Sequence, residues 1–272
     1  MAKTRGNVLF VVLAYGLFWA LAVAALLLFS GNEELFSTAV DYVATIGPWA
    51  PTAALLILFR KLYPGWTIRG FYKDAFKARL KPGVLLAATV AYVAIAAFVV
   101  GLESVSTGVV VSSLLSFSVA GLLTTIFSGA MGEESGWRGH LQRQVEKRHS
   151  VIKSSLIVGV IWAFWHTVTW IPTIQAGYAY YIPLHILSLM SCAMIIGISY
   201  SRCRNLFVPM WIHFMSNIVL NGAQPVLSDP TNPRLVMYIG LEALVAVCYV
   251  IWFVRVSKKE AAAAGDAGAV PA

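Results

Sequence analysis

The stretch GVLLAATVAYVAIAAFVVG, residues 83–101, contains no charged residue. A bilayer core about 30 Å thick is crossed by roughly 20 apolar residues in helical form. The stretch has about that length, so it predicts a helix that spans a membrane.

The rest of the chain has the same character. Of its 272 residues, 59% are hydrophobic and 12% are charged, whereas soluble domains have roughly 45–50% apolar and roughly 25% charged residues. The first apolar run is longer than the roughly 7–15 residues of a signal-peptide core, so we interpret it as a retained helix. The predicted fold class is therefore all-α, a polytopic membrane protein with about eight transmembrane helices. Besides 83–101, the predicted spans are 8–30, 42–59, 107–132, 154–172, 181–200, 206–222 and 235–254.

The positions of the basic residues predict the orientation. The net charge is +8, but the charges lie between apolar runs rather than on one face of a domain, so we expect no nucleic-acid partner. With the N-terminus inside, every Lys and Arg except Arg234 falls in an inside segment. Because short cytoplasmic loops accumulate Lys and Arg, we expect both termini to be cytoplasmic and the protein to lie in a cell membrane, with a prokaryotic plasma membrane favoured.

We expect a single transmembrane helical domain over residues 1–256. The alanine-rich segment 257–272 is small and polar enough to predict a disordered cytoplasmic tail. The stretch IRGFYKDAFKARL, residues 68–80, places its apolar residues near one helical face, which predicts an amphipathic helix on the inner leaflet. The three cysteines have no metal-ligand spacing and are interpreted as buried thiols.

The stretch GEESGWRGH, residues 132–140, places charges at the end of the fourth predicted span. Ionisable groups in a membrane are costly and mark function when they face the protein interior and have partners. Residues four apart share a helical face, so Glu134 can pair with Arg138. Glu133 is turned by about 100° from Glu134 and points elsewhere.

Further polar groups lie in later spans: His166 in the fifth, and His213 with Asn217, four residues apart, in the seventh. Three glycines of the fourth span leave room for another helix to approach closely: Gly129, Gly132 and Gly136. From a rise of about 1.5 Å per residue, His213 lies roughly 10 Å from the inner boundary. Glu133 is nominally at that boundary, unless the fourth helix is tilted or begins late. We expect a polar cavity that opens toward the cytoplasm or the inner leaflet.

Such a cluster can hydrolyse a peptide. A carboxylate can take a proton from water, and histidine and asparagine side chains can orient that water and stabilise a tetrahedral oxyanion. One glutamate and two histidines are also a known zinc ligand set, here Glu133, His166 and His213. These residues do not separate a zinc-dependent hydrolase from one that needs no metal. No HExxH or GxSxG motif is present.

The three motifs together resemble those of the CPBP intramembrane proteases, a family that contains the type II CAAX prenyl endopeptidases and the bacteriocin-immunity (Abi) proteins. The resemblance covers roughly residues 115–222 and rests on motifs at Glu133-Glu134-x-x-x-Arg138, Trp162-x-x-x-His166 and His213-x-x-x-Asn217. It implies that Glu133 activates water, supported by Glu134 and Arg138. It also implies that His166 helps to bind the water and that His213 and Asn217 stabilise the oxyanion. The family usually has phenylalanine where this chain has Trp162, a change that we expect to alter the shape of the pocket more than its chemistry.

Each motif also has a plain structural interpretation. Glu134 with Arg138 is first of all a structural ion pair, and His166 a buried, hydrogen-bonded histidine. Trp162 and Trp165 are packing aromatics that also suit a substrate pocket. His185 and Glu242 belong to no motif and are interpreted as structural, and His140 and His149 as loop residues without a role.

The sequence as a whole predicts an intramembrane endopeptidase whose substrate enters from the cytoplasmic side. The substrate would be a peptide or a membrane protein, with or without an attached lipid. One alternative is a noncatalytic bacteriocin-immunity or scaffold protein. The other is a transporter with a proton relay, which is disfavoured because no internal repeat or interrupted helix pair is evident.

Overall fold

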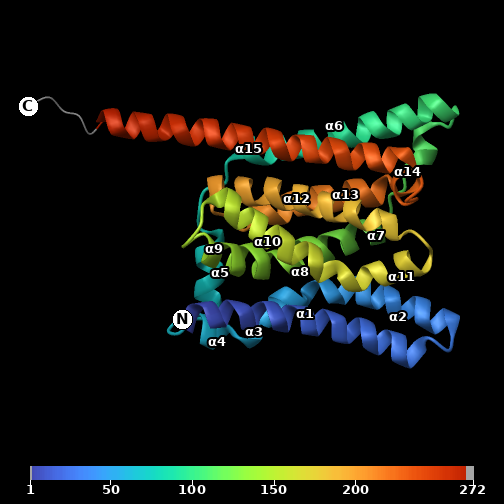
Figure 1. The fold of residues 1–272 in the computed structure, drawn as a ribbon, viewed down its shortest axis with the longest axis horizontal. Helices are drawn as coiled ribbons and strands as arrows, with labels where there is room; N and C mark the ends of the chain where they lie inside the picture. The colour runs from blue at the N-terminus through green and yellow to red at the C-terminus, as the bar shows by residue number, and fades with distance from the viewer. Residues whose placement is uncertain (1, 268–272) are drawn as a thin grey trace, which may run out of the picture.

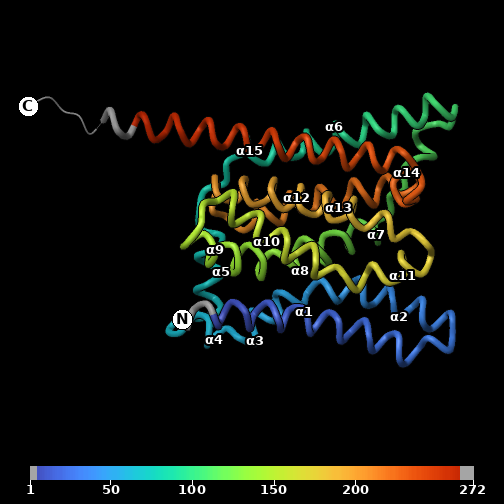
Figure 2. Tube along the Cα trace, viewed as in Figure 1, coloured from blue at the N-terminus to red at the C-terminus, as the bar shows by residue number. Residues whose placement is uncertain are grey.

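The structure, a computed structural model, describes residues 2–267, and among these residues it contains helices and their connections but no strand. Successive segments run in alternating directions and pack side by side (Figures 1 and 2). The long helices are α1 (Ala2–Phe29), α6 (Pro82–Thr107), α10 (Val151–Trp165), α12 (Ile182–Cys203), α13 (Phe207–Gly222) and α15 (Pro233–Ala267). Helix α12 is central, since it packs against α10, α13 and α15.

Shorter helices complete these segments. The α-helices are α2 (Glu33–Ile46), α3 (Ala50–Ile57), α4 (Phe59–Leu62), α5 (Ile68–Phe76), α7 (Val119–Thr125), α8 (Met131–Glu134), α9 (Arg143–Val145), α11 (Trp170–Gln175) and α14 (Gln224–Leu227). The 3₁₀ turns are η1 (Gly47–Trp49), η2 (Val111–Leu114), η5 (His166–Thr169) and η6 (Ala179–Tyr181), and the π-helical segments are η3 (Ile126–Ala130) and η4 (Ser135–Gln142).

Five helical stretches of the described chain are long and apolar enough to cross a membrane: Arg5–Phe29, Pro82–Thr107, Val151–Gln175, Ala179–Cys203 and Pro233–Ala263. They coincide with the predicted spans 8–30, 83–101, 154–172, 181–200 and 235–254, which confirms the all-α membrane class. The predicted spans 42–59, 107–132 and 206–222 correspond to helices that are shorter or divided. The total of about eight spans and the cytoplasmic termini stay predictions.

The second predicted span is divided by prolines. Helix α2 is followed by η1 and α3, with Pro48 and Pro51 in the first turns of these two elements. Proline is tolerated in a first turn because the missing N–H has no partner there in any case. The helical path thus continues from α2 into α3 with a change of geometry, opposite the segment that carries Glu133.

The fourth predicted span, 107–132, is wrong in its boundaries. Helix α6 extends to Thr107 and ends at Gly108, which has a left-handed φ of 73°. The fourth helical segment begins at Val119, where the Ser118 hydroxyl accepts a hydrogen bond from the Gly121 amide, and it continues as far as Val145. This late start places Glu133 and Glu134 in the interior of the segment instead of at its end.

Glycines allow this fourth segment to contact the divided second segment. A Cβ on Gly132 would lie 2.8 Å from the carbonyl oxygen of Pro48, and a Cβ on Gly136 would lie 2.6 Å from that of Pro51. No side chain fits at those distances. The predicted close approach at these glycines is therefore confirmed, and it involves backbone on both sides.

The amphipathic helix is present as α5. Phe71 and Ala75 are buried, whereas Ile68 and Phe76 at its two ends are exposed. The end of the helix is tied to the start of α13, because the Leu206 amide donates to the Ala75 carbonyl and the Asn205 amide group donates to the carbonyls of Phe76 and Ala78. The buried part of the predicted apolar face therefore packs on the protein.

The segment 257–272 was predicted to be a disordered tail, but its described part is helical. Helix α15 continues through residues 257–267, while residues 268–272 lie outside the described part of the chain. Alanine has the highest helix propensity, so the alanine run extends the helix. Two hydrogen bonds of 3.0 and 2.6 Å from the Arg202 guanidinium to the Glu260 carboxylate tie the extension to α12.

Replacing Gly136 by alanine should lower the free energy of unfolding by about 1–3 kcal/mol, the usual cost of overpacking, because its Cβ would overlap Pro51. Thermal unfolding in detergent micelles measures this. Gly101→Ala, where no atom lies within 4 Å of the added Cβ, is the matched control and should be at least as stable as the native protein. Equal stability of both variants would contradict the close approach.

Candidate active site

A cavity of about 230 Å³ lies among the helices α8, α10, α12 and α13. It is lined by all four residues predicted to be catalytic, Glu133, His166, His213 and Asn217, and by Trp162. These residues come from three segments that are far apart in the sequence. The structure thus brings the three motifs to one place.

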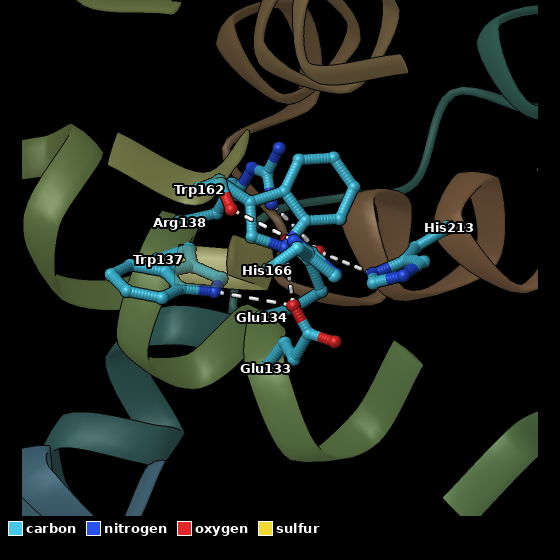
Figure 3. A network of polar contacts seen from close by, with 7 residues as sticks. All are labelled: Glu133, Glu134, Trp137, Arg138, Trp162, His166 and His213. Carbon is cyan, nitrogen blue, oxygen red and sulfur yellow. Dashed lines mark hydrogen bonds and ion pairs between the residues drawn. The ribbon is translucent and has the colours of Figure 1, made fainter. Parts of the chain in front are cut away.

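Glu133 is held by one of its two carboxylate oxygens. Its Oε2 accepts hydrogen bonds from the indole nitrogens of Trp137, at 3.2 Å, and Trp162. Figure 3 shows the other oxygen directed away from both indoles. Among the described residues nothing donates to Oε1, so this oxygen is available to a molecule in the cavity.

Glu134 points to the other side and joins two partners. Its Oε1 accepts from Arg138 Nη1 at 2.9 Å and from His213 Nδ1 at 2.7 Å (Figure 3). The side chains of Glu134 and Arg138 are fully buried. The predicted pair four residues apart is confirmed, and the same carboxylate also fastens α13 to α8.

The hydrogen bonds assign a tautomer to each histidine. A carbonyl oxygen only accepts, so His166 Nδ1 donates to the carbonyl of Trp162, at 2.8 Å, and Nε2 is left as an acceptor. His213 Nδ1 donates to Glu134, which leaves its Nε2 on the side of Gly129. Each histidine is thus oriented by one nitrogen and presents the other to the cavity.

Asn217 faces the same space with a free amide. Its side chain makes no hydrogen bond with the described residues and is only partly buried. A Cβ on Gly129 would lie 2.7 Å from Asn217 Nδ2 and 3.0 Å from His213 Nε2. Glycine at position 129 therefore keeps both polar groups accessible.

Trp162 contacts two charged residues of the site, Glu133 and Arg138. Its ring lies under the Arg138 guanidinium, 4.8 Å from the guanidinium carbon to the ring centroid, and its nitrogen donates to Glu133. Phenylalanine, usual in the family at this position, has no donor. The expectation that the change alters shape more than chemistry is corrected, because tryptophan adds a hydrogen bond to the carboxylate.

Trp165 does not line the cavity, although the sequence suggested it for a substrate pocket. It is fully buried, it is not among the residues that line the cavity, and its nitrogen donates to the carbonyl of Ala14 at 3.1 Å. Its ring stacks on Phe18 and packs edge-on against His166. Trp165 supports the site from behind, and it contacts α1 rather than a substrate pocket.

Several residues of the site were not predicted. Trp137 stands four residues after Glu133 and shares its helical face, a signal that the spacing carries. His185 and Ser188 line the cavity from α12, although neither belongs to a motif. His140, expected in a loop, is buried in η4, where Nδ1 lies 3.0 Å from the hydroxyl of Tyr63.

The region that carries these residues matches a known family. Residues 115–219 match the family described as type II CAAX prenyl endopeptidase Rce1-like. The match supports membership in the CPBP family over this part of the chain. No curated protein matches the chain.

The match agrees with the resemblance found in the three motifs. Together with the apolar helices, the match points to a multi-pass membrane protein and suggests a CAAX-type intramembrane protease. The matched residues include Glu133, Glu134, Arg138, Trp162, His166, His213 and Asn217.

The described side chains of the site are not arranged as a metal centre. Within residues 2–267, no group of three or more His, Cys, Asp or Glu side chains has the arrangement needed to hold an ion. We therefore assign no step of the reaction to zinc.

The cavity extends in a direction that was not expected. It continues past Ser128, Tyr181 and Leu220, toward the end of the bundle where α2, α11 and α14 lie (Figure 1). The start of α1 and the end of α15 lie at the opposite end. The lining residues thus lie toward the end opposite the start of α1, and the opening toward the cytoplasm or the inner leaflet stays a prediction.

Replacing Arg138 by methionine should destabilise the protein by about 3–5 kcal/mol, because it leaves the buried Glu134 carboxylate without its cation. The double variant Glu134→Gln with Arg138→Met should recover most of that loss, since no charge is then left unpaired. Thermal unfolding of both variants in the same detergent tests this. A double variant that is less stable than the single one would contradict an ion pair as the reason for the buried charges.

Proposed function

We propose that the protein is an intramembrane endopeptidase in which Glu133 activates a water molecule. One observation supports this most: the free oxygen of Glu133, Nε2 of His166, Nε2 of His213 and the free amide of Asn217 all face one cavity. A base, a water-binding acceptor and oxyanion donors are the parts that amide hydrolysis needs.

In the first step, Glu133 Oε1 takes a proton from water as the water oxygen bonds to the carbonyl carbon of the substrate. His166 Nε2 accepts the second water hydrogen and thereby orients the attack. The carbonyl oxygen becomes an oxyanion, which receives hydrogen bonds from Asn217 Nδ2 and from Nε2–H of a protonated His213. The Glu134 carboxylate at His213 Nδ1 stabilises that imidazolium.

In the second step, the carbon–nitrogen bond breaks and the proton held by Glu133 passes to the leaving amine. The products are an amine and a carboxylic acid, which gives its remaining proton to solvent and becomes a carboxylate, and Glu133 is again ionised. Two residues act only by position in this scheme. Arg138 holds Glu134, and Trp162 holds Oε2 of Glu133, so that Oε1 faces the substrate.

The substrate in this proposal is a peptide or a membrane protein, with or without an attached lipid. The protein works as a multi-pass protein of a prokaryotic plasma membrane. The family match supports a CAAX-type protease. No observation on the described residues favours the noncatalytic immunity or scaffold protein, or the transporter.

Glu133→Gln should reduce cleavage about 10²–10⁴-fold, the usual contribution of a general base, because an amide cannot take the proton. The assay uses quenched peptides, one farnesylated with a C-terminal CAAX sequence and a library without lipid, on purified protein in detergent. Glu242→Gln is the matched control: Glu242 is equally buried, is held by Tyr92 and Ser188 and does not line the cavity. Full activity of a folded Glu133→Gln protein would rule out this mechanism.

Asn217→Ala should lower kcat about 10²–10³-fold, as the removal of one oxyanion donor does, with little change in KM. The stability of the protein should hardly change, because the Asn217 side chain makes no hydrogen bond with the described residues that the substitution would remove. Steady-state kinetics and thermal unfolding on one preparation check both points. A loss of stability with unchanged kcat would instead assign Asn217 a structural role.

A further inference from the structure

A second cavity adjoins the candidate active site. It has a volume of about 480 Å³ and shares Ser128, Gly129 and Asn217 with the first. At its far end it is lined by Ser116, which precedes α7, and by Gln224, which begins α14. The two cavities therefore lie next to each other, between Glu133 and the connections at one end of the bundle.

The second cavity is lined by uncharged polar groups. Hydroxyl and amide side chains follow one another along it: Ser116, Ser118, Thr124, Thr125, Asn221 and Gln224. Among the described residues, the side chains of Ser116, Thr124 and Gln224 make no hydrogen bond. Polar groups at membrane depth are tolerated where they line a water-filled cavity. Donors and acceptors without charge suit the main chain of an extended peptide, which offers one N–H and one C=O per residue.

The opposite end of the site is closed. Residues 132–142 are buried without interruption. His140 is covered by Phe10, at 4.7 Å between ring centroids, and by Tyr63. The ring of Phe71 packs over Gly139. The two cavities found on this side share no lining residue with the one that contains Glu133.

The distribution of charge assigns these ends to the two sides of the membrane. The closed end carries the start of α1, the end of α15 and the basic segments around α4, α5 and α9. Arg234 lies at the open end and is neutralised by Glu103, with 3.0 Å between Nε and Oε2. Because basic residues accumulate on the cytoplasmic side, the open end is the extracytoplasmic one.

We propose that residues 116–129 and 217–224 form a substrate path that admits an extended peptide from the extracytoplasmic side and delivers it to Glu133. The proposal rests on the proposed function, which supplies the reason for a peptide to enter. It identifies the substrate as a polypeptide segment already exposed outside the membrane. This is opposite to the side expected from the sequence.

The test places single cysteines in a background without native ones, made by Cys192→Ala, Cys203→Ala and Cys248→Ala. Thr124→Cys lies on the path, and Lys153→Cys, an exposed position in the first turn of α10, lies at the closed end. Right-side-out and inverted vesicles are treated with a membrane-impermeant, positively charged methanethiosulfonate. Modified cysteine is then measured as the fraction protected from a large maleimide, which retards the protein in a gel.

The expected result is modification of Thr124→Cys at least ten times faster in right-side-out than in inverted vesicles, with the reverse preference for Lys153→Cys. External modification of Thr124→Cys should also slow the cleavage of a quenched peptide added outside at least tenfold. Modification of both cysteines from the same side would overturn the path. If Thr124→Cys is modified from the inside and Lys153→Cys from the outside, the extracytoplasmic opening of the path is overturned. Modification that leaves cleavage unchanged would overturn its role in substrate entry.

The labelling does not depend on catalysis, so the two proposals fail separately. If the unmodified protein cleaves no peptide while Thr124→Cys is labelled only from outside, the proposed function is wrong and the opening stands. If the peptide is cleaved only when it is supplied to the inner side of inverted vesicles, the proposed function stands and the path is wrong.

Discussion

The arrangement of the site depends on the buried carboxylate of Glu134. It accepts a hydrogen bond from Arg138 one turn further along the same segment and another from His213 on α13. Taking two charges out of water costs several kcal/mol per ion, so such a pair persists only when its geometry is good. The ion pair holds the Glu134 carboxylate in place, and the hydrogen bond from His213 to that carboxylate fastens α13, which also carries Asn217, to α8.

Two adjacent glutamates can differ in this way because consecutive helical residues point about 100° apart. Glu134 faces the arginine and the histidine, while Glu133 faces the two tryptophans and the cavity. The segment is π-helical on both sides of the pair, in η3 and η4. Such π-helical turns occur frequently at functional sites, and here they flank the carboxylate proposed as the base.

Glycines along this segment both allow close packing of backbone and border the polar site. Gly132 and Gly136 admit the backbone of the divided second segment, and Gly129 leaves room for Asn217 and His213. Small residues at helix interfaces let backbones approach in a membrane, where lipid offers no hydrophobic force between helices. The glycines thus create both the contact that encloses the site and the space within it.

Much of the fold and of the candidate site could be predicted from the sequence. Hydropathy indicates the all-α membrane class because apolar length is a local property of the chain. Helical periodicity predicts the pairing of Glu134 with Arg138, since both residues lie on one helix. The order of the motifs on successive segments indicates the family, although it does not show their chemistry.

Features that depend on contacts between residues far apart in the sequence could be determined only from the tertiary structure. Hydropathy did not mark the start of the fourth segment, because residues 108–118 are largely apolar but are not part of a long helix. The hydrogen bond from Trp162 to Glu133, and the place of His185 in the cavity, depend on how separate helices pack. The direction in which the cavity extends was decided in the same way. Side chains from several segments close one end and leave the other lined by polar groups, and no spacing along a single helix contains that information.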